Sequence, residues 1–75
     1  MAIVDVTVHI DETIDRDRRA KIANTVRAHK GVAAVSHDDK KPHLMLIKFN
    51  PDAVTSTELL QLVLDQGVHA ELVGL

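Results

Sequence analysis

The sequence contains no cysteine, tryptophan or tyrosine, and Phe49 is its only aromatic residue. The absence of cysteine excludes disulfide bonds and thiolate metal ligands. The lack of aromatic residues argues against a platform for single-stranded nucleic acid, because such platforms stack bases on exposed aromatic side chains. Without disulfides, a chain of 75 residues depends for its stability on an aliphatic core and, where that core is too small, on a partner.

Long apolar runs and a strong charge of one sign are also missing. No apolar run reaches the ~20 residues that span a bilayer, and the polar first ten residues do not resemble a signal peptide. The expected location is therefore cytoplasmic. The net charge of −2 provides no attraction to nucleic acid or to an anionic membrane, so neither is an expected partner. The length predicts a single domain over residues 1–75.

Two kinds of apolar periodicity alternate along the chain. Branched apolar residues at every second position from Val4 to Ile10 predict a half-buried strand, and the spacing of Ile14, Ile22 and Val26 predicts a helix. Extended over the whole sequence, the same reading predicts four strands and two helices. The strands are 3–10, 32–37, 43–49 and 69–74, and the helices are 14–29 and 55–66.

Polar and conformationally special residues separate these elements. Asp11, Glu12 and Thr13 offer oxygens that can cap the first helix, and Thr55 with Glu58 forms a capping-box pattern for the second. Gly31 suits the left-handed position after a helix. The segment 38–42 is expected to be a turn, because Pro42 cannot donate a hydrogen bond inside a central strand.

This element order predicts an α+β ferredoxin-like βαββαβ sandwich. Its antiparallel sheet has the strand order fourth, first, third, second, and both helices cover one face. ACT-type regulatory domains and several RNA-binding modules share this order of elements. The side chains expected to form the centre of the core are Val6, Ile22, Val26, Ile47, Leu59 and Val63.

Three stretches resemble the heavy-metal-associated domain of copper chaperones and P-type metal ATPases. They are Gly31-Val32 with Val35, the segment Ile47-Lys48-Phe49-Asn50-Pro51-Asp52, and Leu59 and Val63 followed by Gly67-Val68-His69-Ala70-Glu71-Leu72-Val73. The resemblance extends over nearly the whole chain. It implies the same ferredoxin-like fold and, by analogy, a role as a metal carrier.

In that family, a Met-x-Cys-x-x-Cys loop before the first helix holds a soft ion such as Cu(I). In this sequence Thr13 stands at the position of the methionine, and Asp15 and Arg18 stand at the two cysteines. A carboxylate binds soft ions poorly, and a guanidinium does not coordinate metals. The resemblance therefore does not extend to Cu(I) transfer through this loop.

Histidines are the alternative metal ligands. The antiparallel topology brings the end of the first strand, at His9, near the starts of the third and fourth strands, at His43 and His69. Strand alternation makes His9 and His69 candidate cross-strand neighbours. The prediction is a site at His9, His69 and His43 for Zn(II), Ni(II), Co(II) or Cu(II), with Asp11 or Glu71 as oxygen ligands. The alternative is that these are polar residues at strand ends.

The remaining polar residues give weaker signals. His37 is expected at the rim of the same end, and His29 is expected to act as a favourable cation near a helix C-terminus. Arg16, Arg18 and Arg19 lie in the first helical turns, where they could hold an anion or meet an acidic partner. The simpler interpretation is a solvated face whose charge neighbouring aspartates offset.

The face of the sheet without helices is expected to be partly apolar, with Ile3, Leu44, Leu46, Val73 and Leu75 lying around Thr7, Lys48 and Glu71. Such a patch favours a homodimer or a larger protein partner. There is no cysteine nucleophile and no catalytic motif around Ser36 or Ser56, so an enzyme is not expected. Two functions remain open: a metal-carrier-like domain that uses histidines, and a non-catalytic interaction or regulatory module that has lost metal binding.

Overall fold

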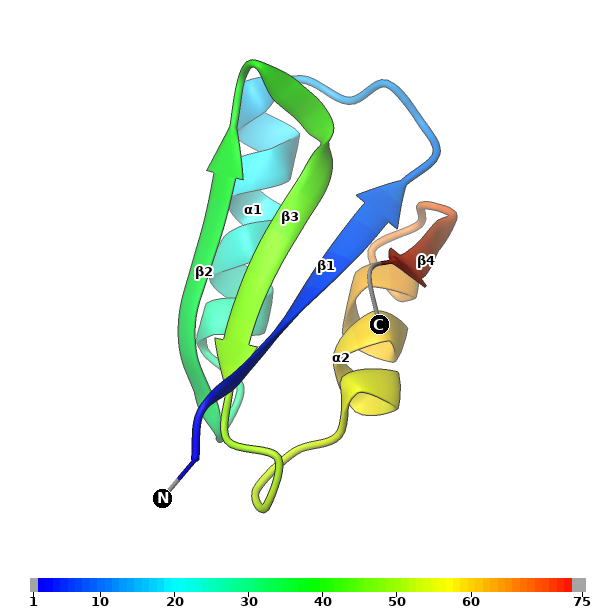
Figure 1. The fold of residues 1–75 in the computed structure, drawn as a ribbon. Coiled ribbons are helices and arrows are strands. Elements are labelled where there is room, and N and C mark those ends of the chain that lie inside the picture. Colours follow the sequence, from blue (N-terminus) through cyan, green and yellow to red (C-terminus); the bar gives the residue numbers. More distant parts are fainter. Residues whose placement is uncertain (1, 74–75) are drawn as a thin grey trace.

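The computed structural model describes residues 2–73, which form four strands and two helices in the expected order (Figure 1). The predicted element boundaries differ from the observed ones by up to two residues, apart from residue 74 of the predicted last strand, which lies outside the described residues. The elements are β1 Val4–Ile10, α1 Arg16–Arg27, β2 Val32–Asp38, β3 Lys41–Phe49, α2 Ser56–Leu64 and β4 Ala70–Val73.

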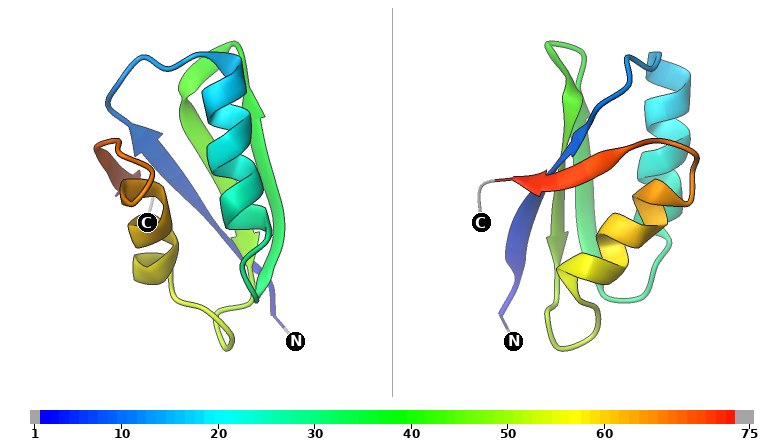
Figure 2. Two further views of the ribbon diagram at one scale, coloured as in Figure 1. Left: turned by 180° about the vertical axis from the view of Figure 1, so that it is seen from behind. Right: turned by 90° about the vertical axis from the view of Figure 1, so that its right-hand side faces the viewer.

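The sheet has the order β2-β3-β1-β4, which confirms the predicted order fourth, first, third, second. β1 pairs antiparallel with both β3 and β4, and β2 pairs antiparallel with β3. Both helices lie on the same side of the sheet (Figure 2). The fold is therefore the ferredoxin-like βαββαβ sandwich, and one face of its sheet has no helix over it.

The core lies between the sheet and the two helices. In the register of β1 with β3, Val6 is opposite Ile47 and Val8 is opposite Met45. These four side chains are buried, because alternate residues of both central strands point to the helix-covered face. The six side chains predicted to form the centre of the core are all buried as well.

The two helices begin at capping residues, one of which the sequence reading misplaced. Thr55 is the N-cap of α2, and its side chain accepts from the backbone N–H of Glu58 at 3.1 Å, as expected. For α1 the N-cap is Asp15 rather than a residue in 11–13, because the Asp15 carboxylate accepts from the N–H of Arg18 at 2.8 Å. Ile14, which precedes this cap, is buried against the core.

Pro42 lies inside β3, where the sequence reading predicted a turn. A register shift follows the pair His37 and Met45, so that Asp38 pairs with Lys41 and leaves a short turn at 39–40. Pro42 falls within this irregularity, and the ladder with β1 ends at the pair of His9 and Leu44. A proline is tolerated here because bulges do not require its missing N–H.

Gly31 follows α1 with φ +91°, in the left-handed region that was expected for it. A Cβ at this position would lie 2.8 Å from the Cβ of Ala53. The glycine is thus required both by its backbone conformation and by the close approach of the loop after β3.

The helix-free face carries the expected apolar residues in part. Leu44, Leu46 and Val73 are half-buried, and Ile3 is 49% exposed. Leu75, which was also expected here, lies outside the described residues. Leu44 and Leu46 line a surface hollow of about 460 Å³ together with residues of β1 and β2. Among residues 2–73, neither helix is long and apolar enough to cross a membrane.

Replacing Ile47 with alanine is expected to cost about 2–5 kcal/mol of the free energy of unfolding, since the side chain is fully buried between sheet and helices. Urea unfolding measures this loss. The matched control is Ile3→Ala on the opposite, open face, which should change stability by less than about 0.5 kcal/mol. A loss of stability below about 1 kcal/mol for Ile47→Ala would mean that the helices do not cover the face of β3 that carries Ile47.

Candidate metal site

A cluster of potential metal ligands lies at the end of the sheet where β1 finishes. In the register of β1 with β4, His9 is directly opposite Glu71. Directly opposed residues on one face of a sheet bring their Cβ atoms to about 4.5–5.5 Å. Asp11 is the first residue after β1, two positions from His9, so its carboxylate lies close to the ring of His9.

The side chains of His9, Asp11 and Glu71 each offer one ligand atom, and these atoms all lie within 4.8 Å of one another. His9 Nδ1 is 3.2 Å from Asp11 Oδ1, so these two groups are already in contact. Asp11 and Glu71 are exposed and His9 is half-buried. A set of one imidazole and two carboxylates that faces solvent is chemically suited to a divalent cation.

His43 lies against this cluster without belonging to it. Its ring stacks on the ring of His9, with centroids 5.6 Å apart and planes inclined by 17°. The β1–β3 ladder ends at Leu44, so the ring of His43 lies beyond the last paired residue. Its Nδ1 lies 2.8 Å from the carbonyl oxygen of Ile10, an acceptor, which means that Nδ1 carries the proton. This hydrogen bond fixes the ring of His43 beside that of His9.

His69 is not the cross-strand neighbour of His9 that strand alternation suggested. The register pairs His9 with Glu71, and His69 lies just before β4 begins. Glu12 accepts from the backbone N–H of His69 at 2.8 Å and from its Nδ1 at 2.6 Å. The N–H of Asp11 in turn donates to the carbonyl oxygen of His69 at 2.8 Å. These bonds join the β1–α1 loop to the start of β4.

The pairing of His69 with Glu12 changes how both groups titrate. The hydrogen bond that His69 donates to Glu12, and then the negative charge of Glu12, raise the pKa of His69 above its ordinary value of 6.5. The same side-chain hydrogen bond is the main reason that the pKa of Glu12 lies below 4.5. This pair could not be predicted from the sequence, because its members are separated by 57 positions and lie outside regular elements.

The other two histidines contribute no ligand atom to the cluster. His37 pairs with Met45 and contributes to the hollow over the helix-free face. His29 follows the C-cap of α1, and its Nδ1 lies 2.8 Å from the carbonyl oxygen of its neighbour Lys30.

The loop that aligns with the Met-x-Cys-x-x-Cys motif has a structural role here. Asp15 caps α1, and the guanidinium of Arg18 donates to the carbonyl oxygen of Gln66 at 3.1 Å, after the end of α2. Thr13 is exposed. The two positions at which the resemblance would place metal-binding cysteines are therefore occupied by groups that fix the start of α1.

Comparison with known proteins identifies this fold in several metal-binding domains. No protein-family model and no curated protein sequence matches the chain. Oxidized MerP from Ralstonia metallidurans CH34 superposes with a TM-score of 0.86 at 14% identity, over 97% of this chain and 100% of MerP. The apo copper chaperone of Enterococcus hirae gives a TM-score of 0.81 at 25% identity, over 91% and 98% of the two chains.

A third similar structure is the yeast copper transporter domain CCC2A, which was determined in apo and Cu(I)-loaded states. It gives a TM-score of 0.82 at 17% identity, over 93% of this chain and 94% of that domain. The chain therefore has the fold of heavy-metal-associated domains, as the sequence resemblance predicted. At these identities the comparisons establish the fold, and the metal chemistry has to be argued from this chain's own residues.

The Glu12–His69 pair leads to a prediction about pH. Its contribution to stability should be greatest between pH 4.5 and 6.5. It declines as the pH rises through the raised pKa of His69, which then loses its proton, and also as the pH falls through the lowered pKa of Glu12. An NMR titration of the His69 ring should show a midpoint above 6.5, and Glu12→Gln should bring it back toward 6.5.

The matched control is Glu58→Gln, which removes an equal charge in the first turn of α2 and should leave the titration of His69 unchanged. If His69 titrates at the same pH in the wild type and in Glu12→Gln, the pair does not form in solution.

Proposed function

We propose that this protein is a metal-carrier-like domain that binds a divalent transition metal through His9, Asp11 and Glu71. The convergence of their three ligand atoms within 4.8 Å carries the proposal. Support for a carrier role comes from the fold, which this chain shares with a copper chaperone and a copper transporter domain. A non-catalytic role and a cytoplasmic location are part of the same proposal.

The ligand chemistry favours borderline ions. Imidazole suits Zn(II), Ni(II), Co(II) and Cu(II), whereas the absence of thiolates disfavours Cu(I). Three protein ligands leave a coordination position for water or for a ligand from another molecule. A site of this kind exchanges its metal more readily than a closed site with four protein ligands, and such exchange is what a carrier requires.

The proposed ligands differ in part from the set His9, His43 and His69 that the sequence suggested. His9 is retained. His43 supports it from behind, by stacking on its ring, and metal ligands commonly depend on such supporting contacts. His69 is held by Glu12, so Glu71, its neighbour two residues along β4, takes its place opposite His9.

Titration of untagged protein with Zn(II) or Ni(II), followed by histidine NMR and calorimetry, tests the site. The ring signals of His9 should respond first, followed by those of the stacked His43. His9→Ala and Glu71→Gln should each weaken binding by about tenfold or more, because each removes one of only three ligands. Binding should also weaken as the pH falls, because a metal competes with protons for its imidazole and carboxylate ligands.

His29→Ala is the matched control, because it removes a histidine at the far end of the molecule and should leave the affinity unchanged. An equal response of all five histidines would indicate non-specific surface binding. It would favour the alternative function, a non-catalytic interaction or regulatory module.

A second function is favoured by the helix-free face of the sheet. Half-buried Leu44 and Leu46 line a hollow there, and Val73 of β4 lies on the same face. Apolar surface of this kind commonly marks a protein interface. We propose that the face pairs with a second copy of the chain or with a protein partner, either beside the metal function or in place of it.

Leu46→Lys is expected to convert a dimer into a monomer in sedimentation experiments, since it places a charge in the centre of the apolar face. Gln61→Lys is the control, because it introduces the same charge at an exposed position of α2, on the opposite side of the molecule from the helix-free face, and should leave the dimer intact. A wild type that stays monomeric at high concentration would exclude the homodimer.

A further inference from the structure

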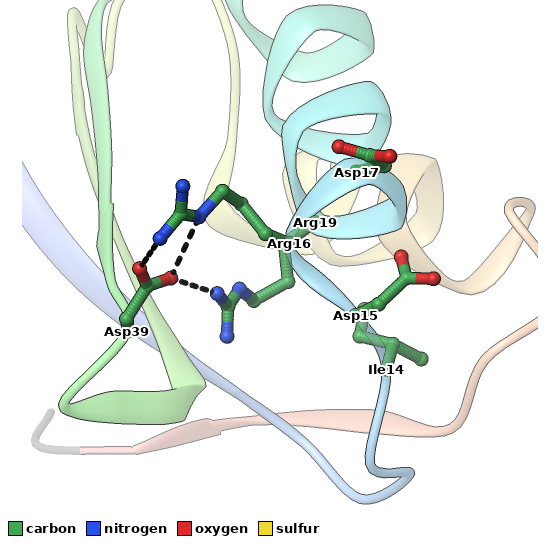
Figure 3. Close-up of a pocket in the computed structure, with 6 residues that line it drawn as sticks. All are labelled: Ile14, Asp15, Arg16, Asp17, Arg19 and Asp39. Carbon is green, nitrogen blue, oxygen red and sulfur yellow. Dashed lines mark hydrogen bonds and ion pairs between the residues drawn. The ribbon is translucent and has the colours of Figure 1, made fainter.

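The start of α1 carries an open surface pocket of about 590 Å³ that is lined largely by charged residues (Figure 3). Two of these residues, Arg16 and Arg19, extend from the first turn of the helix toward Asp39 in the β2–β3 turn. The remaining lining residues are Ile14, Asp15 and Asp17. Nothing in the proposed metal function uses this part of the molecule.

The two arginines differ sharply in their surroundings. The side chain of Arg16 is 73% exposed, whereas that of Arg19 is only 5% exposed. Arg19 Nη2 donates to Asp39, but Arg19 Nε is buried and has no hydrogen-bond acceptor within residues 2–73. A buried N–H of a charged group that has no hydrogen-bond acceptor costs free energy. Because this N–H lies next to a pocket, a ligand bound there could supply the missing acceptor.

The geometry shows why Asp39 alone does not satisfy this donor. Arg16 directs Nε and Nη2, one edge of its guanidinium, at the Asp39 carboxylate, with the Nε contact at 3.4 Å. Arg19 reaches the same carboxylate with Nη2. Its Nε lies on the same edge as Nη2 and therefore faces the same side. Two guanidinium edges with four donors thus converge on a planar group with two oxygens.

A tetrahedral oxyanion matches this arrangement better than a carboxylate does. Its oxygens are spread in three dimensions, so that they can accept from both guanidinium edges at once. The site also lies at the N-terminus of a helix of 12 residues, where the helix dipole favours an anion. We propose that Arg16 and Arg19 form a binding site for a small tetrahedral oxyanion such as phosphate, and that Asp39 is its internal competitor.

The surrounding charges set the strength of this site. Asp15 is engaged by the N–H of Arg18 as the helix cap, and Asp17 is exposed on the first turn. Both carboxylates oppose an incoming anion, as Asp39 does while it is in place. The wild type should therefore bind phosphate weakly, and displacement of Asp39 would release the β2–β3 turn from α1.

The test is a titration with inorganic phosphate at constant pH and ionic strength, followed through the Nε–H signals of Arg16 and Arg19 and through backbone amides. A parallel titration with chloride provides the reference. Phosphate should give saturable shifts at Arg19 Nε–H and at residues 39–40 that chloride does not give. Asp39→Asn should bind phosphate roughly tenfold more tightly, because the competing carboxylate charge is gone.

Arg16→Gln should weaken phosphate binding by roughly tenfold, because it removes one of the two guanidinium edges. Lys21→Gln removes the same charge from an exposed position of α1 outside the pocket, so it should bind as the wild type does. Equal shifts with chloride, or a phosphate affinity that Asp39→Asn does not increase, would show that the two arginines and Asp39 form only a structural ion pair. If Asp39→Asn does not fold, unchanged affinity in Arg16→Gln overturns the proposal by itself.

Discussion

The antiparallel pairing of β1 with both of its neighbours is the constraint on which the rest of the structure depends. Within residues 2–73, β1 is the only strand that pairs with both β3 and β4, and its alternate residues Val6, Val8 and Ile10 are buried in the core. Because β3 and β4 both run against it, the end of β1 meets the beginnings of both. The residues at that end, His9 and Asp11, are thereby placed beside Glu71 and His43.

The start of α1 is held in place by polar contacts within the chain. Where the resemblance would place thiolates, Asp15 caps the helix and Arg18 reaches the end of α2. Arg16 and Arg19 connect the same turn to Asp39, and this pairing holds the pKa of Asp39 below its ordinary value, chiefly through the hydrogen bond from Arg16. Hydrogen bonds and ion pairs therefore order the start of α1 and join it to α2 and to the β2–β3 turn.

The sequence was sufficient to predict the fold because every level of the pattern agreed. Period-two strands, amphipathic helices, the Thr55 cap and Gly31 all indicated one topology, and agreement across levels is what specifies a fold. The predicted element boundaries were wrong at two places. Pro42 lies inside β3 because of a register irregularity, and the N-cap of α1 is Asp15 because its carboxylate accepts from the N–H of Arg18. Local propensity does not encode either feature.

The candidate site was predictable only in outline. Topology placed His9, His43 and His69 at one end of the sheet, but a shift of two residues in register exchanges His69 for Glu71 opposite His9. Glu12 and Asp39 gave no sequence signal as partners, because their contacts with His69 and with the arginines join loops that are distant along the chain. Strand register and loop contacts depend on three-dimensional packing. They determine which side chains lie close enough together to bind the same metal ion or anion.

The most direct test of the proposed metal function is a crystal structure of the untagged protein loaded with zinc, with the metal located by its anomalous scattering. If His9, Asp11 and Glu71 bind the metal, one main peak lies at about 2.0–2.2 Å from a ring nitrogen of His9 and from carboxylate oxygens of Asp11 and Glu71. A main peak between His69 and Glu12, or zinc spread at low occupancy over several surface histidines, would contradict it.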